Sequence, residues 1–176
     1  FAIGQPARDL DVVAAFPGRV PYRLTFDDDF ARPGARLVGR LRQLRALTDT
    51  EEVLALTARR PGAGGHLALV LTANGVRRTY PLDDSSAPGT VYQEKLVVSP
   101  GGATLAGRVP TSEAPAADQG MRVQLVQSAT AGGDPVSVSS QSFPLRLNGA
   151  TVTMLVPSGP SWTAGSPAAP VLEVAL

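Results

Sequence analysis

The chain has 176 residues, of which 43% are hydrophobic and 18% charged, and its formal net charge is +1. This length can form one medium domain or two small ones with a buried core, and the near-neutral charge gives no field to attract nucleic acid or an anionic membrane. Cysteine is absent, which excludes disulfides and thiolate metal sites, and no apolar run approaches the roughly 18 residues of a membrane-spanning helix.

The chain begins at Phe1 and not at a methionine, which indicates a processed or trimmed form. Residues 1–18 are expected to be an N-terminal extension whose apolar patch, residues 10–16, forms a short strand or a helical turn before Pro17-Gly18. Apolar side chains then alternate through residues 19–26, which predicts a strand with Pro21 at its start or at a sheet edge. An acidic turn of three aspartates follows, at positions 27–29.

Residues 35–41 (Ala-Arg-Leu-Val-Gly-Arg-Leu) have a near copy 68 positions later, in residues 103–109 (Ala-Thr-Leu-Ala-Gly-Arg-Val). Both copies follow a Pro/Gly turn, and each predicts a strand with a glycine in its middle. The leucines of residues 37–60 also fit a helix face, and Thr48 with Glu51 could form a capping box, so an α+β fold is the alternative. The repeat favours strands, because Pro110 and Pro115 are incompatible with a helix after the second copy.

Two Asn-Gly pairs, at Asn74-Gly75 and Asn148-Gly149, predict β-hairpins. Further strands are expected at residues 90–99, 121–128, 136–139 and 171–176, and a Pro/Gly/Ser loop at residues 158–170. The pattern predicts an all-β fold made of two tandem Ig-like β-sandwich units, residues 19–98 and 99–176. One larger sandwich with an internal repeat is the other arrangement that fits.

The second unit resembles bacterial Ig-like and carboxypeptidase-regulatory-like sandwiches. The resemblance lies in Leu105-Ala106-Gly107-Arg108-Val109, then Gly120-Met121-Arg122-Val123-Gln124-Leu125, and later Phe143-Pro144-Leu145-Arg146-Leu147. It covers about half of the second unit and fewer residues of the first. The loop between the first two motifs is rich in Pro and Ala, and it lacks the Gly-Asp type of turn common in that family. The resemblance implies an accessory or adhesion-type module that is extracytoplasmic and has no catalytic activity of its own.

The residue types that carry most enzyme chemistry are scarce. His66 is the single histidine, and its place beside a Gly-Gly turn favours a surface residue over a catalytic one. Two acidic runs, Asp27-Asp28-Asp29 and Asp83-Asp84, could offer oxygen ligands to calcium, but acidic turns are common without metal. We therefore assign no catalytic, cofactor-binding or metal-binding residue and expect no cofactor.

Two further groups of side chains are candidates for binding. The first comprises arginines that could form a basic sheet face, for which a solvated, edge-protecting row is the favoured interpretation: Arg36, Arg40, Arg42, Arg59, Arg60, Arg77 and Arg78. The second comprises aromatic residues that could stack on a sugar: Tyr80, Tyr92 and Trp162. Trp162 could equally plug one end of a sandwich or anchor an interface.

From Ser99 onward the chain carries few charges. They are three arginines and four acids: Arg108, Arg122, Arg146, Glu113, Asp118, Asp134 and Glu173. A weakly charged, Ser/Thr-rich surface suits packing against another protein. We therefore expect a non-catalytic structural or interaction module of an exported envelope, appendage or virion assembly. Its partner would be another protein or copies of itself, with no nucleic acid and no membrane span; a glycan- or cell-wall-binding module is the alternative.

Overall fold

The structure is a computed structural model that describes residues 6–26, 39–82, 87–117, 120–163 and 171–176. Its one helix in these ranges is short, and the rest of its regular structure is strand, so the predicted all-β fold is confirmed. The elements in chain order are α1 (Pro6–Ala15), β1 (Tyr22–Phe26), β2 (Gly39–Asp49), β3 (Glu52–Arg59), β4 (His66–Ala73), β5 (Val76–Pro81), β6 (Val91–Ser99), β7 (Gly102–Leu105), β8 (Ser112–Pro115), β9 (Met121–Ser128), β10 (Pro135–Phe143), β11 (Leu145–Asn148), β12 (Thr151–Thr163) and β13 (Leu172–Ala175).

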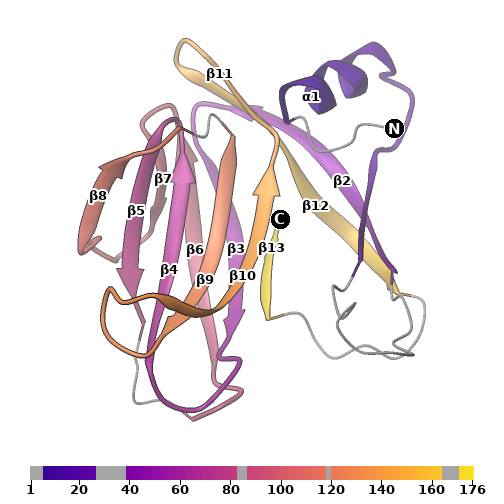
Figure 1. Cartoon of the computed structure of the whole chain (residues 1–176). Helices are drawn as coiled ribbons and strands as arrows, with labels where there is room; N and C mark the ends of the chain where they lie inside the picture. The colour runs from indigo at the N-terminus through magenta and orange to yellow at the C-terminus, as the bar shows by residue number, and fades with distance from the viewer. Residues whose placement is uncertain (1–5, 27–38, 83–86, 118–119, 164–170) are drawn as a thin grey trace.

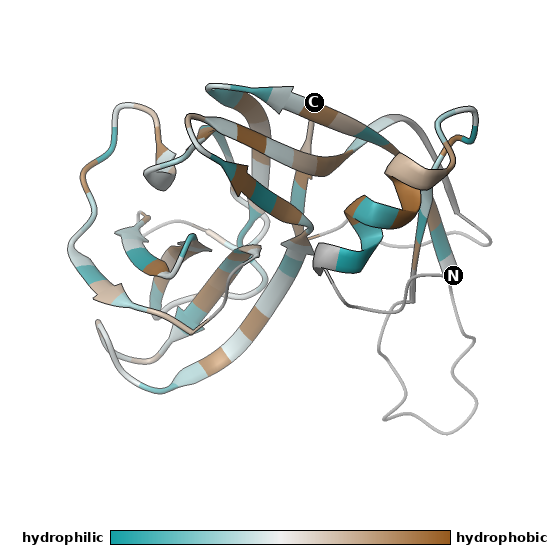
Figure 2. Ribbon diagram, turned by 90° about the horizontal axis from the view of Figure 1, so that it is seen from above, coloured by the Kyte–Doolittle hydropathy of each residue, from teal (hydrophilic) through white to brown (hydrophobic). Residues whose placement is uncertain are grey.

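The strands form three antiparallel sheets (Figure 1). The front sheet has the order β10-β9-β4-β5-β8, and the back sheet has the order β13-β3-β6-β7. These two face each other as a sandwich. The third sheet, of order β1-β2-β12-β11, extends to one side and is called the arm sheet here; α1 lies over it (Figures 1 and 2).

The predicted division at 98/99 into two separate units is wrong, because every sheet contains strands from both sides of it. In the arm sheet β2 pairs with β12, in the front sheet β4 pairs with β9, and in the back sheet β6 pairs with β7. The boundary itself falls inside β6. The alternative, one larger sandwich with an internal repeat, is closer in that both halves of the chain share the sheets.

The doubled Gly-Arg motif does not mark equivalent strands. Gly39-Arg40 begins β2, whereas Gly107-Arg108 follows the end of β7, and Gly107 turns the chain with a φ of +75°. The consequence drawn from the motif is nevertheless confirmed, since β2 and β3 cover residues 39–49 and 52–59 as strands and exclude the helical alternative there.

Both Asn-Gly turns form the expected hairpins. Ala73 pairs with Val76 around Asn74 and Gly75, whose φ values of +51° and +72° suit the tight turn that matches strand twist. Asn148 pairs with Thr151 in the β11–β12 hairpin. Three features were missed: the extension contains a full helix, β8 lies in the expected loop at 110–119, and β12 continues to Thr163 through the expected loop carrying Trp162.

The core lies between the front and back sheets, and β12 extends it to the arm. Val152, Met154 and Val156 join the main core, while the intervening Leu155 faces the opposite way and packs with Leu44 of β2 and Leu10 of α1. Alternating burial on both faces of β12 follows from the two-residue period of a strand. It explains how one short helix is held to an otherwise all-β body.

Polar contacts also fasten the arm sheet to the sandwich. The Arg42 guanidinium lies 2.6 Å from the Glu173 carboxylate of β13, and the Arg23 guanidinium lies over the buried Phe143 ring, 5.1 Å from its centroid. The Leu176 amide donates to the Pro157 carbonyl at 3.1 Å, where the β12 ladder has its register shift. The arm therefore contacts the strands of both sandwich sheets.

Candidate functional site

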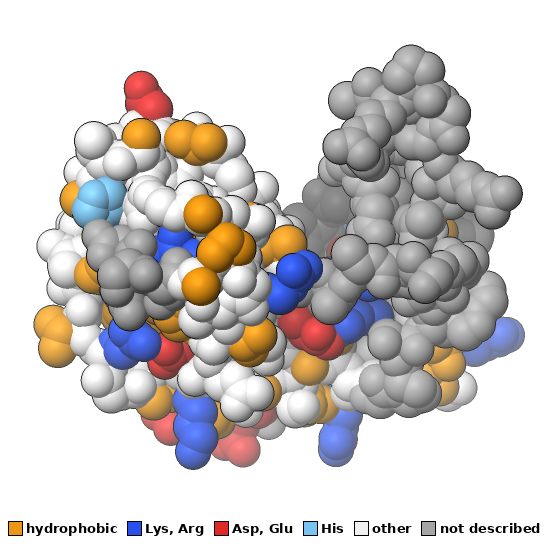
Figure 3. Space-filling view, turned by 90° about the horizontal axis from the view of Figure 1, so that it is seen from below, with side chains coloured by type: hydrophobic (Ala, Val, Ile, Leu, Met, Phe, Trp, Pro, Cys, Tyr) orange, Lys and Arg blue, Asp and Glu red, His pale blue; other side chains and the backbone are white. Residues whose placement is uncertain are grey.

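His66 begins β4, half-buried at the molecular surface, opposite Ser128 of β9 (Figure 3). The two acidic runs at 27–29 and 83–84 lie outside the described residues. Among the residues that the structure describes, no group of three His, Cys, Asp or Glu side chains is placed to hold a metal ion. No helix in the same ranges is long and apolar enough to cross a membrane.

The arginines proposed for a basic face are spread over three sheets. Arg40 and Arg42 lie in the arm sheet, Arg59 lies at the end of β3 with Arg60 directly after it, and Arg77 and Arg78 lie in β5; Arg36 is outside the described residues. Arg60 is fully buried, and its Nη1 donates to the Gly64 carbonyl at 2.8 Å. Figure 3 accordingly shows basic side chains scattered singly on the face in view. The described arginines do not form a shared basic face.

The aromatic candidates are also separated. Tyr80 is fully buried in the front sheet, so this candidate for sugar stacking on the glycan-binding alternative is excluded. Tyr92 is half-buried against the core, and the Trp162 backbone pairs with Leu41 in the arm sheet. The alternating pattern placed Tyr80 on one face of β5, but it did not predict which face the second sheet would cover.

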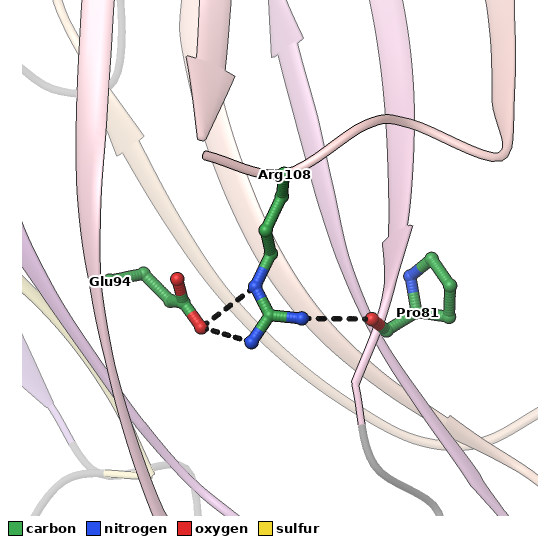
Figure 4. Close-up of polar contacts among 3 residues, drawn as sticks. All are labelled: Pro81, Glu94 and Arg108. Atoms are coloured by element: carbon green, nitrogen blue, oxygen red, sulfur yellow. Dashed lines mark hydrogen bonds and ion pairs between the residues drawn. The ribbon is translucent and has the colours of Figure 1, made fainter. Parts of the chain in front are cut away.

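Two ion pairs lie where the front and back sheets close on each other, and we call their four residues the arginine clasp: Arg78, Glu94, Arg108 and Glu113. Glu94 lies on the inner face of β6, opposite Leu56 of β3, and its side chain is only 12% exposed. Arg108 reaches it from the turn after β7, with Nε 2.9 Å and Nη2 2.5 Å from Oε1 (Figure 4). The third nitrogen, Nη1, donates to the Pro81 carbonyl of β5 at 3.5 Å, so one side chain joins both sheets.

Arg78 makes the second bridge of the clasp. Its Nε donates to Glu113 of β8 at 2.7 Å, and its Nη1 donates to the Ala103 carbonyl of β7 at 3.2 Å. A Cβ on Gly102 would lie 2.8 Å from Nη1, and Gly102 has a φ of +113°, so only glycine fits there. The pair thereby ties the outer strand of the front sheet to the outer strand of the back sheet.

The electrostatics of the clasp indicate a structural role for its charged residues and not a catalytic one. The hydrogen bonds that Arg108 donates to the Glu94 carboxylate raise the pKa of Arg108 and hold its positive charge. Burial raises the pKa of the neighbouring Tyr80 phenol, against a hydrogen bond with the Leu105 backbone that lowers it. With each guanidinium paired to a carboxylate, the clasp neutralises the one acid on the inner face of β6 and closes the sandwich.

A different kind of site lies at the sheet edges. Five of the six edge strands in the described sheets are short, with five residues in β1 and four in β7, β8, β11 and β13. Four of these five also contain a charged residue, and charge and shortness are how proteins protect an open edge. The sixth, β10, has nine residues and no charged residue. Val136 and Val138 on it are 73% and 50% exposed.

The outer face of the front sheet continues the apolar character of β10. Strand register places Val138, Val126, Ala68 and Pro81 side by side across β10, β9, β4 and β5. This set is called the apolar row. The next row, which runs from Ser140 to Thr79, is uncharged as well. The valine–serine alternation of residues 136–139 was visible in the sequence, but that this strand would lie at an edge depended on the pairing.

These features define the class of the protein: an all-β, sandwich-like domain with a charge-paired closure at one edge and an open, neutral strand at the other. Residues 1–143 match the family described as a domain of unknown function, DUF7846, and the chain belongs to that family. No curated protein and no solved structure matches the chain. No match to an Ig-like or carboxypeptidase-regulatory-like family was found, so that resemblance stays a prediction.

The family match ends at Phe143, the last residue of β10. The strands β11, β12 and β13 therefore lie beyond it, although β12 buries Met154 and Leu155 on its two opposite faces and β13 pairs with β3. In this chain the residues after 143 complete the back and arm sheets around the matched part.

Proposed function

We propose that this domain is a non-catalytic interaction module of an exported assembly, and that it acts through protein–protein contacts at the β10 edge. The observation that carries the proposal is the contrast among the edges: β10 combines nine residues with no charge, while the other described edges are short. An unprotected edge offers backbone N–H and C=O groups to an incoming strand, which is the basis of binding by strand addition.

The arginine clasp stabilises the edge of the sandwich that lies opposite β10. The charged residues Arg78, Glu94, Arg108 and Glu113 are paired within the molecule and stabilise the closed edge. The opposite edge is held at its far end, where Gln141 donates to the Leu172 carbonyl at 2.6 Å. Because β10 is already formed as a strand of the front sheet, binding at its edge requires little further ordering of the chain.

The glycan-binding alternative loses one of its three aromatic candidates, since Tyr80 is buried.

Export is proposed on the sparse charge and Ser/Thr-rich composition of the second half. It can be tested with a Val109→Cys variant of the natural protein, because Val109 is 85% exposed and the chain has no other cysteine. A thiol reagent that cannot cross the cytoplasmic membrane should label this variant in intact cells. Labelling only after lysis would contradict export.

The interaction itself can be tested by placing a photo-cross-linking amino acid at position 138 in the cells that make the protein. The matched control is position 53, because Val53 is 53% exposed but lies in β3, between β13 and β6. We expect a covalent protein adduct at 138 and none at 53. An absence of adducts at 138, or equal adducts at both positions, would refute the proposed function.

A further inference from the structure

We infer that β10 pairs with β10 of a second copy of this chain, antiparallel and about a two-fold axis at Val138. The inference rests on the proposed function and names its partner. It joins two front sheets edge to edge into one continuous sheet.

The part of β10 that is open to a partner has two natural ends. On one side Pro135 has no amide to donate, and the β9 register shifts between Pro135 and Ser137. On the other side the Gln141 side chain donates to the Leu172 carbonyl of β13, which ties that end of the strand to the back sheet. Residues 136–140 remain between these limits, and Val138 is their centre.

An open stretch centred on one residue suits a two-fold contact. Such a contact is isologous, so each residue on one side of the axis meets its counterpart across it. With the axis at Val138, the two Val138 side chains lie opposite each other, Ser137 meets Ser139, and Val136 meets Ser140. Every residue in this set is uncharged, so identical strands meet without the repulsion that a single charge near the axis would cause.

The apolar row gives the contact a continuous outer surface. It runs from Pro81 through Ala68 and Val126 to Val138, where it ends at the sheet edge with Val138 half exposed. Pairing at Val138 places the end of this row against the end of the same row in the second copy. The exposed valine is thereby flanked by apolar neighbours on both sides.

The absence of cysteine makes the register directly testable. Directly opposed residues of an antiparallel pair have Cα atoms about 4.5–5.5 Å apart, within the range that a disulfide spans. Under mild oxidation Val138→Cys should therefore give a covalent dimer, and the equally exposed Val53→Cys should give no more than the collisional background. A mixture of Val136→Cys with Ser140→Cys should give the mixed dimer, since these positions are opposed.

The unmodified chain should also dimerise reversibly. In light scattering coupled to size exclusion, its mass should approach twice the 18.2 kDa of one chain as concentration rises. Val138→Lys should raise the dissociation constant about tenfold or more, because two ammonium groups would meet at the axis, while Val53→Lys should leave it unchanged. Circular dichroism of both lysine variants should match the wild type, because both positions are exposed.

Three results would overturn the inference: a chain that stays monomeric up to about 1 mM, a dimer that survives Val138→Lys, or equal disulfide formation at 138 and 53. The photo-cross-linking experiment distinguishes a failure of the self-pairing inference from a failure of the proposed function. An adduct at 138 to a different protein would support the interaction module and overturn self-pairing. An adduct to the same chain would support both.

Discussion

Removing Arg108 should destabilise the fold more than removing its partner Glu94. In Arg108→Met the Glu94 carboxylate stays on the inner face of β6 beside Leu56, 12% exposed, and loses two donors at 2.9 and 2.5 Å. Breaking a fully buried ion pair costs about 3–5 kcal/mol. Because the Arg108 side chain is 37% exposed, we reduce this figure to about 2 kcal/mol.

The reciprocal variant should behave differently. Glu94→Leu puts an apolar side chain next to Leu56, and the exposed Arg108 can turn its guanidinium into water, so the expected cost is below about 1 kcal/mol. The double variant should lie within about 1 kcal/mol of the wild type, because the stranded carboxylate is gone. Arg77→Met, an exposed arginine of the neighbouring front sheet, is the control and should change stability by less than about 0.5 kcal/mol.

Urea unfolding followed by far-ultraviolet circular dichroism measures all four variants. In thermal unfolding the Arg108→Met midpoint should fall by about 4–8 °C, from about 2–4 °C per kcal/mol in a domain of this size. If Glu94→Leu costs as much as Arg108→Met, or if the two single effects simply add in the double variant, the clasp does not neutralise a buried acid as argued.

Three other substitutions test the docking of α1, the half-buried Asp9 carboxyl group and the buried Tyr80 phenol. Leu10→Ala should cost about 2–3 kcal/mol and speed amide hydrogen exchange in α1 but not in β4, because Leu10 is the buried contact between helix and arm sheet; unchanged exchange in α1 would contradict this docking. Burial raises the pKa of Asp9 above its ordinary 3.8, against the attraction of Arg23, so its ionisation removes stability as the pH rises through the folded-state pKa. Asp9→Asn should therefore be more stable than the wild type at neutral pH and equal to it below about pH 3.8 in urea titrations; a less stable variant at neutral pH would argue against the assignment. Tyr80→Phe should change stability by less than about 1 kcal/mol, because the buried hydroxyl it removes makes no well-aligned hydrogen bond and interacts only weakly with the Leu105 backbone; a loss above about 1 kcal/mol would show that the bond to Leu105 is strong.

The sequence predicted best those elements whose backbone conformation depends on a few neighbouring residues. The β4–β5 hairpin followed from Asn74-Gly75, because few other residue pairs accept two successive positive φ angles. β9 was predicted with its observed bounds, since Met121, Val123 and Leu125 alternate with polar neighbours. The helix α1 was missed because its ten residues bury mainly Leu10, too narrow a stripe to distinguish from a strand.

The candidate sites were less accessible from sequence. The clasp unites Arg78, Glu94, Arg108 and Glu113 from three strands and a turn, and their spacing along the chain carries no sign that they meet. Tyr80, a candidate for sugar stacking on the glycan-binding alternative, is buried, because the same alternation describes both faces of β5 until a second sheet covers one of them.

The order of residues was sufficient to specify strands, turns and the all-β class, because these depend on side chains a few positions apart and on what each backbone can adopt. Which strands became neighbours was decided only in three dimensions. The pairing of β2 with β12 and of β4 with β9 overrode the apparent internal repeat, and the resulting core buries apolar side chains from both halves of the chain. The same pairing left the uncharged strand β10 at the edge of the front sheet. Its edge position depends on how the sheets assemble and could not be predicted from the strand's own residues.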